Sequence, residues 1–200
     1  MPKIEVYTSI TNSKDIPRTD IKCFNEYDKF KNPVMNAKIY KILPHKYLDC
    51  DISIWMDGNL FLLISPEEIV EKWLGDADMA LLRHYKSKNL DWELKWIKYI
   101  WRSKDRGVYE EAKKQVEGYE KYNIQKEEMG MCGMIIRRHT PIVERFNEAW
   151  WSEICCKGQR DQLSFPIIRR QFPEMKVNLV EGNIKNYPYV RYETHNHFKT

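Results

Sequence analysis

The hydrophobic pattern of the chain alternates between two periods, and this alternation limits the folds available to it. Short segments with an apolar residue at every second position indicate strands, and longer segments with apolar residues three or four apart indicate helices. Strand and helix segments that alternate along a chain build a mixed, mainly parallel sheet flanked by helices on both faces, so we predict an α/β, Rossmann-like fold. Expected strands cover residues 3–11, 21–28, 51–57, 77–84, 133–139 and parts of the tail after 174, and expected helices cover 32–45, 66–74, 91–101, 108–122, 142–156 and a segment that begins near 160.

The chain is expected to form one domain over residues 1–200. Its 200 residues, 42% of them hydrophobic, suffice for one packed core, and no segment rich in Gly, Ser or Pro divides them. The net charge of +4 comes from 33 basic and 29 acidic residues that are interleaved along the chain. This mixture disfavours a nucleic-acid partner, because proteins that bind nucleic acids usually carry their basic residues concentrated on one face.

Cysteine usage and hydropathy predict a cytoplasmic protein. The chain has 5 cysteines, and its closest pair, Cys155 and Cys156, is adjacent and unsuited to a disulfide. We therefore expect free thiols in a reducing compartment. No apolar signal region follows Met1, and no apolar run reaches the length of a membrane span, so no membrane span is expected.

The segment Asp57-Gly58-Asn59 begins at the last residue of the expected strand 51–57. In such sheets ligands bind beyond the carboxyl ends of the strands, and side-chain oxygens two residues apart can converge on Mg²⁺ or Mn²⁺. The alternative is a simple turn, since Asp-Gly and Gly-Asn are common turn dipeptides. Asp49 and Asp51 have the same D-x-D spacing but stand where this strand begins, so they are expected at the opposite edge and rank second.

Lys38 and Lys41 lie three residues apart in the expected helix 32–45 and therefore share one face of it. Two cations on one face would suit a diphosphate. The alternative is a solvated helix face without a ligand.

Three histidines and one aspartate complete the candidates. His84 ends the expected strand 77–84, on the same rim as Asp57. Asp161 begins a helix, where it could take a proton from an attacking hydroxyl. The alternative is that Asp161 only interacts favourably with the helix dipole and has no catalytic role. His195 and His197 have the H-x-H spacing that points both side chains to one side of a strand, as metal ligands require. Surface or packed histidines are the alternative for each.

The ordered segments LPHKYLDCDISIWMDGN, VYEEAKKQ, MIIRRHTPIVERFNEAWWSEI and RDQLSF resemble the glycosyltransferase-like domain family related to plant ceramidase-type and mucilage-type proteins. The resemblance runs from YTSIT near the start to about Phe165. It implies a GT-A-like fold, in which an α/β sheet binds a nucleotide sugar and carries an Asp-containing metal motif at a strand end.

By this resemblance, Asp57 and Asn59 stand at the D-x-D position. The resemblance also assigns Tyr7, Thr8 and Ser9 to the nucleotide pocket, Lys38, Lys41 and His45 to a K-x-x-K-x-x-P-H pattern, His84 to a family histidine, and Arg160, Asp161 and Gln162 to an R-D-Q motif. Three departures stand out. Asn59 is a neutral ligand, so either the metal affinity is weaker or a third ligand comes from the tail. CFNE replaces the F-T-D-like end of the second strand that contacts the base in the family, and the segment 88–101 separates His84 from YEEA like an insertion.

The resemblance implies transfer of a sugar from a nucleoside diphosphate sugar, with a UDP-sugar favoured, to a hydroxyl acceptor on a glycan or related molecule. Mn²⁺ or Mg²⁺ held by Asp57, Asn59 and His195 or His197 would bridge the two phosphates. Asp57 and Asp161 are the expected catalytic residues, with Asp161 as the base of an inverting reaction, whereas a retaining reaction needs no such base. A hydrolase on the same fold and a non-catalytic nucleotide-sugar or glycan-binding module remain open.

Overall fold

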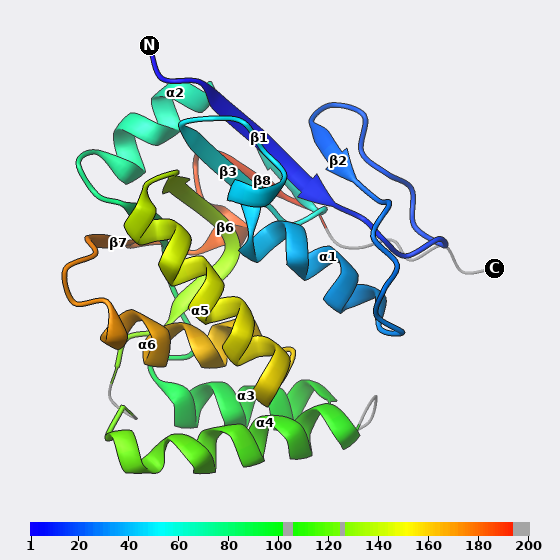
Figure 1. Ribbon diagram of the computed structural model, residues 1–200, viewed down its shortest axis with the longest axis vertical. Helices are drawn as coiled ribbons and strands as arrows, with labels where there is room; N and C mark the ends of the chain where they lie inside the picture. The colour runs from blue at the N-terminus through cyan, green and yellow to red at the C-terminus, as the bar shows by residue number, and fades with distance from the viewer. Residues whose placement is uncertain (102–105, 125–126, 194–200) are drawn as a thin grey trace.

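A six-stranded mixed sheet lies at the centre of the molecule in a computed structural model that describes residues 1–101, 106–124 and 127–193 (Figure 1). Of these six strands, β6 alone runs antiparallel to its neighbours. The sheet is therefore the mixed, mainly parallel one that the sequence predicts. The strands, in their order across the sheet, are β2 (Lys22–Phe24), β1 (Ile4–Ser9), β3 (Ile52–Met56), β6 (Gly130–Arg138), β5 (Met79–Arg83) and β7 (Val177–Val180).

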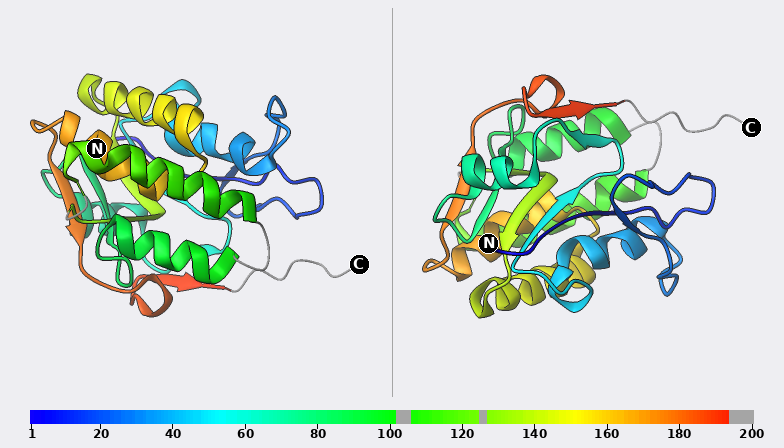
Figure 2. Two further views of the ribbon diagram at one scale, coloured as in Figure 1. Left: turned by 90° about the horizontal axis from the view of Figure 1, so that it is seen from below. Right: turned by 90° about the horizontal axis from the view of Figure 1, so that it is seen from above.

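Both faces of the sheet are covered, by different kinds of layer. One face carries α1 (Pro33–Ile42), α5 (Pro141–Lys157) and α6 (Asp161–Gln171), and the pair α3 (Leu90–Trp101) and α4 (Arg106–Tyr119) packs side by side beyond α6 (Figures 1 and 2). The other face carries α2 (Pro66–Ile69), its π-helical continuation Val70–Leu74, and a ribbon of β4 (Leu60–Leu62) and β8 (Val190–Tyr192). Short 3-10 segments cover Pro44–Lys46, Glu120–Tyr122 and Ile184–Asn186. Within the described ranges, no helix is both long enough and apolar enough to cross a bilayer.

The central strand β3 shows what the two layers do to the sequence pattern. All five of its residues are buried. Ile52, Ile54 and Met56 face the core under the β4–β8 ribbon, whereas Trp55 faces the core under the helices. The period of two therefore divides the strand between two cores, not between core and solvent.

The segment 66–74 begins and ends where its sequence signals predict. Ser65 forms a capping box, in which its Oγ accepts from the backbone N–H of Glu68 at 3.2 Å and its own N–H donates to the Glu68 carboxylate at 3.1 Å. Gly75 ends the segment with φ of 51°, a left-handed conformation that favours glycine.

Two features of the strands are not predicted by the hydrophobic pattern. Strand β4 has three residues, too few for a period to show. The antiparallel direction of β6 follows from α3 and α4, which return the chain to the edge at which β5 ends. Arg83 at the end of β5 therefore pairs with Gly130 at the start of β6.

A buried arginine ties α1 to the sheet and to α5. Arg137, in β6, has no exposed surface, and its guanidinium donates to the backbone oxygens of Lys41 at 2.8 Å and Ile42 at 3.3 Å. It also donates to Asn147 Oδ1 of α5 at 2.9 Å. These carbonyls belong to the last turn of α1, where the helix dipole favours a cation. Arg137 thus positions the helix that carries Lys38 and Lys41.

We predict that Arg137→Leu lowers the free energy of unfolding by at least about 2 kcal/mol, because it leaves several buried acceptors without a donor. Urea denaturation followed by circular dichroism measures the loss. The control, Arg83→Leu, removes the two surface ion pairs of Arg83 with Glu128 and Glu181 and should cost about 1 kcal/mol or less. Equal effects of the two variants would contradict the structural role of Arg137.

Candidate functional site

A cleft of about 460 Å³ opens beyond the carboxyl ends of β1 and β3. Helices α1 and α6 form one wall, and the start of β6 and the β8 region form the other. Residues from four separate segments of the chain that were predicted as site residues meet here. The cleft is lined by Ser9, Val34, Ala37, Lys38, Lys41, Trp55, Asp57, Gly58, Asn59, Leu60, Met131, Cys132, Gly133, Arg160, Asp161, Gln162, Ile184 and Tyr192.

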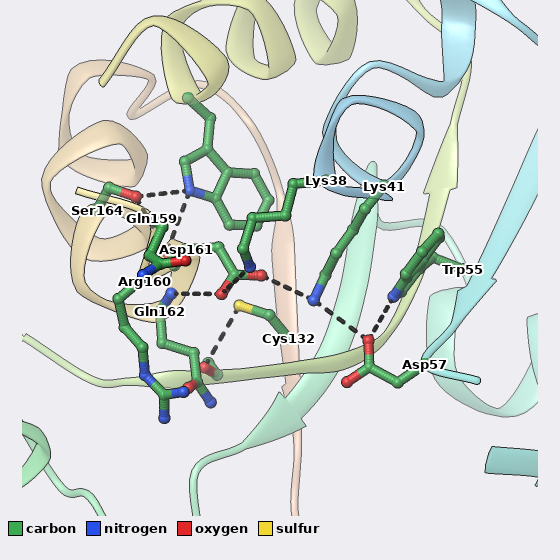
Figure 3. Close-up of polar contacts among 12 residues, drawn as sticks. Lys38, Lys41, Trp55, Asp57, Cys132, Gln159, Arg160, Asp161, Gln162 and Ser164 are labelled. Atoms are coloured by element: carbon green, nitrogen blue, oxygen red, sulfur yellow. Dashed lines mark hydrogen bonds and ion pairs between the residues drawn. The ribbon is translucent and has the colours of Figure 1, made fainter. Parts of the chain in front are cut away.

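A buried carboxylate with two lysines lies at the bottom of this cleft (Figure 3). Asp161, the first residue of α6, is 4% exposed, and its two carboxylate oxygens lie 3.0 Å from Lys38 Nζ and 2.7 Å from Lys41 Nζ. The Asp161 backbone oxygen accepts a hydrogen bond from Trp150 Nε1 at 3.2 Å. The start of α6 is therefore held against α1 and α5 by charged and neutral contacts together.

The three charged groups of this cluster shift one another's pKa. Burial alone would raise the pKa of Asp161, but Lys38 and Lys41 outweigh it and hold that pKa well below its usual range. Burial lowers the pKa of Lys38, and its neighbour Asp161 offsets this only in part. For Lys41 the two carboxylates of Asp161 and Asp57 outweigh burial and raise the pKa. Asp161 is therefore an ionised, fully engaged carboxylate.

Asp57 forms a turn and lines the cleft at the same time. Its backbone oxygen accepts from Leu60 N at 2.9 Å, which closes the tight turn between β3 and β4. Its Oδ1 accepts from Trp55 Nε1 at 2.9 Å and lies 3.4 Å from Lys41 Nζ. The two interpretations of Asp57-Gly58-Asn59, turn and ligand site, are thus compatible, because the turn is what presents the carboxylate to the cleft.

Asn59 connects the turn to the end of the described chain. Its Nδ2 donates to Glu193 O at 3.0 Å, and its backbone oxygen accepts from Glu193 N at 2.9 Å. With the amide nitrogen so engaged, the side-chain oxygen of Asn59 is its remaining ligand atom. His195 and His197 lie outside the described residues, but Glu193, two positions before His195, is fixed beside Asn59.

The donor set of Asp57 and Asn59 fits a cation that shares its coordination with a substrate. Among the described residues, no three His, Cys, Asp or Glu side chains form a cluster able to hold a metal ion by themselves. Mg²⁺ and similar cations are often held by one or two carboxylates together with water and phosphate oxygens. The hard oxygen atoms at this turn suit Mg²⁺ or Mn²⁺ in that arrangement.

A second charged pair borders the other side of the cleft. Arg160, the N-cap residue of α6, donates from Nε and Nη2 to Glu93 Oε1 at 3.0 and 2.7 Å. Glu93 lies in α3 and has no exposed surface. His84 lies next to this pair, with its Nε2 3.8 Å from Glu93 Oε2, while its Nδ1 accepts from Ser87 N at 2.8 Å.

A protein-family model for the TOD1/MUCI70 glycosyltransferase-like domain matches residues 22–189. The chain belongs to this family. A curated relative from Arabidopsis thaliana, "Probable hexosyltransferase MUCI70", is 30% identical over 148 residues, which cover 67% of this chain and 24% of that protein. The chain therefore spans about a quarter of the length of this relative.

The TOD1/MUCI70 domain has a GT-A-like fold. The apo structure of the WbbM bifunctional glycosyltransferase aligns with 96% of this chain and 46% of that chain, with a TM-score of 0.55 and 12% sequence identity. The apo structure of mouse xyloside xylosyltransferase 1 aligns with 72% of this chain and 50% of that chain, with a TM-score of 0.43 and 12% identity. The first of these likenesses and the mixed sheet confirm the predicted fold class.

Of the three residues predicted for the nucleotide pocket after β1, only Ser9 lines the cleft of the TOD1/MUCI70 domain. Tyr7 and Thr8 have no exposed surface. The Tyr7 hydroxyl donates to Tyr40 O at 3.2 Å, and its ring packs edge-on against Trp55. Their assignment to the pocket is corrected here, because β1 is covered on both faces and only its last residue emerges at the rim.

His45 and His84 do not line the cleft either. His45 lies beyond the C-terminal end of α1, and its Nε2 is 3.2 Å from Glu148 of α5. Since that end of α1 points away from the carboxyl edge of the sheet, a direct contact of His45 with a nucleotide is not supported. His84 is 8% exposed and its pKa is lowered by burial. His84 lies beside Glu93, and Glu93 in turn binds Arg160, which lines the cleft.

The geometry also changes the expected role of Asp161. A general base needs a free lone pair and a pKa near the working pH. Both oxygens of Asp161 face lysine ammonium groups, and its pKa is lowered. This carboxylate is suited to hold Lys38 and Lys41 in place. The prediction of Asp161 as a base is therefore not supported by its surroundings.

Sequence reasoning did not select Trp55 and Glu93 as site residues. The Trp55 indole orients the Asp57 carboxylate, and its position two residues earlier on the same strand is a recognisable signal. Glu93 gives no such signal, because it lies 67 residues from Arg160 and only the fold brings the two together.

We predict that Asp161→Asn lowers the free energy of unfolding by about 3 kcal/mol near neutral pH, because it removes the buried carboxylate that pairs with both Lys38 and Lys41 and leaves Lys41 only its longer contact with Asp57. A native pKa below the unfolded value of about 3.9 stabilises the fold above that value, and this stabilisation is lost as the pH falls. The difference between the parent and Asp161→Asn should therefore shrink between pH 5 and pH 3.

Urea denaturation of both proteins across this pH range measures the difference. Asp28→Asn is the control, because Asp28 forms a surface pair with Lys29 and its side chain is 81% exposed. This variant should leave the stability nearly unchanged. A constant difference between the parent and Asp161→Asn at all pH values would contradict the ionised, lysine-paired state of Asp161.

Proposed function

We propose that this TOD1/MUCI70 domain transfers a sugar from a nucleoside diphosphate sugar to a hydroxyl acceptor on a glycan, with the help of a divalent cation. The observation that carries the proposal is the charge balance of the cleft. Lys38 and Lys41 are matched by Asp57 and Asp161, so the formal charges of these four groups cancel. A diphosphate brought into such a cleft needs an additional cation, and Asp57 and Asn59 offer oxygen ligands at its edge.

An adjoining pocket of about 600 Å³ supports the nucleotide part of the proposal. It shares Ser9, Val34, Ala37 and Gly58 with the cleft. Its other walls come from the loop between β1 and β2 and from Phe61, and include Ile10, Ile16 and Pro17. Polar side chains of the same loop, among them Thr11, Asn12 and Asp15, also line it. Apolar surface for the base together with polar groups for the ribose suits a nucleoside. We place the nucleoside in this pocket and the diphosphate next to Asp57, with UDP as the first base to test.

The residues that surround the expected position of the diphosphate have defined tasks in this proposal. Asp57 and Asn59, with His195 or His197, would hold Mn²⁺ or Mg²⁺, which supplies Lewis-acid stabilisation of the charge on the leaving diphosphate. Lys41, held between two carboxylates, places its N–H donors beside that diphosphate. Trp55 keeps the Asp57 carboxylate oriented. Because Asp161 is engaged by both lysines, we propose that the acceptor proton passes to a departing phosphate oxygen.

Thermal-shift measurements with UDP, GDP and their sugars, with and without Mn²⁺, test the proposal. A stabilisation that requires both the nucleotide and the cation is the expected result, because only a ligand that binds the folded state raises its melting temperature. Release of the free nucleoside diphosphate with an added glycan acceptor then separates a transferase from a binding module. Release in the absence of any acceptor would favour a hydrolase. No stabilisation by any nucleotide would overturn the proposal.

We predict that Asp57→Asn weakens Mn²⁺-dependent binding of the nucleoside diphosphate at least about tenfold, because it removes the charged ligand of the cation. Isothermal titration calorimetry measures the affinity with and without Mn²⁺. Asp51→Asn is the matched control, since Asp51 belongs to the alternative D-x-D and accepts from Lys3 N at the opposite edge of the sheet. A loss of binding in the Asp51 variant and not in the Asp57 variant would reverse the assignment.

A further inference from the structure

The pair of Glu93 and Arg160 has no role in the proposed contacts with the diphosphate, although Arg160 lines the cleft. Glu93 is entirely buried, and each of its carboxylate oxygens has a donor. Its Oε1 accepts twice from Arg160, and its Oε2 accepts from Ser87 Oγ at 2.6 Å. A buried carboxylate is costly unless it is satisfied in this way, so the arrangement fixes the plane of the Arg160 guanidinium.

The fixed guanidinium has donors to spare. Glu93 engages Nε and Nη2 of Arg160 and leaves Nη1 outside the pair, and Arg160 lines the cleft. The Arg160 side chain is 29% exposed, whereas that of Glu93 is fully covered. Of the two residues, Arg160 is therefore the one that is exposed to the cleft. Because the charge of Arg160 is balanced by Glu93, the pair presents directed N–H groups with little net charge.

The strand order places this pair on the far side of Asp57 from the nucleoside pocket. That pocket lies next to β1 and β2 and includes none of Arg160, Asp161 and Gln162. Asp57 follows β3, whereas His84 and Ser87, which border Glu93, follow β5. Since β6 separates β3 from β5, two strand spacings of about 4.8 Å, or about 10 Å in total, lie between the two positions. Figure 3 likewise shows Arg160 and Asp57 on opposite sides of the cluster.

A nucleoside diphosphate sugar has its sugar on the side of the diphosphate away from the nucleoside. We propose that Arg160 donates hydrogen bonds to the hydroxyl oxygens of the donor sugar, and that Glu93 is the positioning residue that aims it. Gln162, 9% exposed and next to Arg160 in the cleft wall, adds an amide to the same subsite. This inference rests on the proposed function and names the residues of α3 and α6 that select the sugar.

Orientation of Arg160 by Glu93 and simple electrostatics predict different effects for removal of the Glu93 charge. Removing the negative charge of Glu93 leaves Arg160 as an uncompensated cation at the rim. A Coulomb attraction would then strengthen binding of any nucleoside diphosphate. If Glu93 instead serves to orient the Arg160 guanidinium, its loss weakens recognition of the sugar and leaves the affinity for the diphosphate nearly unchanged. The ratio of the affinity for a UDP-sugar to that for UDP separates the two effects.

The experiment compares the affinities of the parent protein and its variants for UDP, UDP-glucose, UDP-galactose and UDP-xylose by calorimetry with Mn²⁺. The sugar nucleotide bound most tightly by the parent is used for the ratio. Glu93→Gln and Arg160→Lys should each lower the preference for that ligand over UDP about tenfold and change the affinity for UDP less than about twofold. The double variant should lose no more than either single variant, because both changes disable one element.

Glu148→Gln is the control, since Glu148 pairs with Lys46 at 2.7 Å outside the cleft. It should leave the ratio unchanged. The inference is overturned if the ratio of the affinity for the UDP-sugar to that for UDP is unchanged in both cleft variants. This holds whether the two affinities fall equally or UDP binds more tightly. Failure of the parent to bind any nucleotide would instead reject the proposed function. Where Glu93→Gln does not fold, Arg160→Lys at the exposed rim still decides the question.

Discussion

The ion cluster of Asp161 with Lys38 and Lys41 is the constraint on which the cleft depends. Taking three charged groups out of water is costly, and the cost is offset only because each ammonium lies within 3.0 Å of a carboxylate oxygen. These contacts join α1 to α6, two helices that are far apart in sequence. Arg137 holds the same C-terminal part of α1 through the backbone carbonyls of Lys41 and Ile42. The cleft wall is therefore built from buried polar contacts as well as apolar packing, and its shape is specified by directional bonds.

Asp57 shows how one short turn can serve both fold and site. The turn returns the chain from β3 into β4, and β4 pairs with β8, so the same residues that close the cleft also fix the chain near Glu193. The carboxylate is aimed by Trp55 from within the strand and by Lys41 from α1. Its geometry thus depends on both cores of the protein, since Met56 packs in one and Trp55 in the other.

Most strands, the helices and the rim of this fold could be predicted from the sequence because each has a local signal, whereas the three-residue strand β4 has none. The capping box at Ser65, the glycine at position 75 and the alternation in β3 are of this kind. The antiparallel direction of β6 and the pairing of β4 with β8 could not, because both depend on where distant segments return. The site divides in the same way. The types of residue at Asp57, Lys38, Lys41 and Asp161 are visible in the sequence, but whether a side chain is exposed is a property of the packed layers. Tyr7 and Thr8 were misplaced for this reason. His45 was misplaced because it lies beyond the end of α1 that points away from the cleft.

The same distinction explains why a carboxylate in a suggestive motif can have a structural task. Asp161 stands in the R-D-Q segment, at a helix start and on the predicted rim, which are the features of a reactive group. Its surroundings reverse this conclusion, because two ammonium groups stabilise the ionised form and thereby make the oxygen a weaker proton acceptor. The consequence extends to the whole cleft. Since its lysines are already neutralised by carboxylates, an anionic ligand gains little from them until another cation arrives, and in the proposed function this couples binding of the donor to binding of the metal.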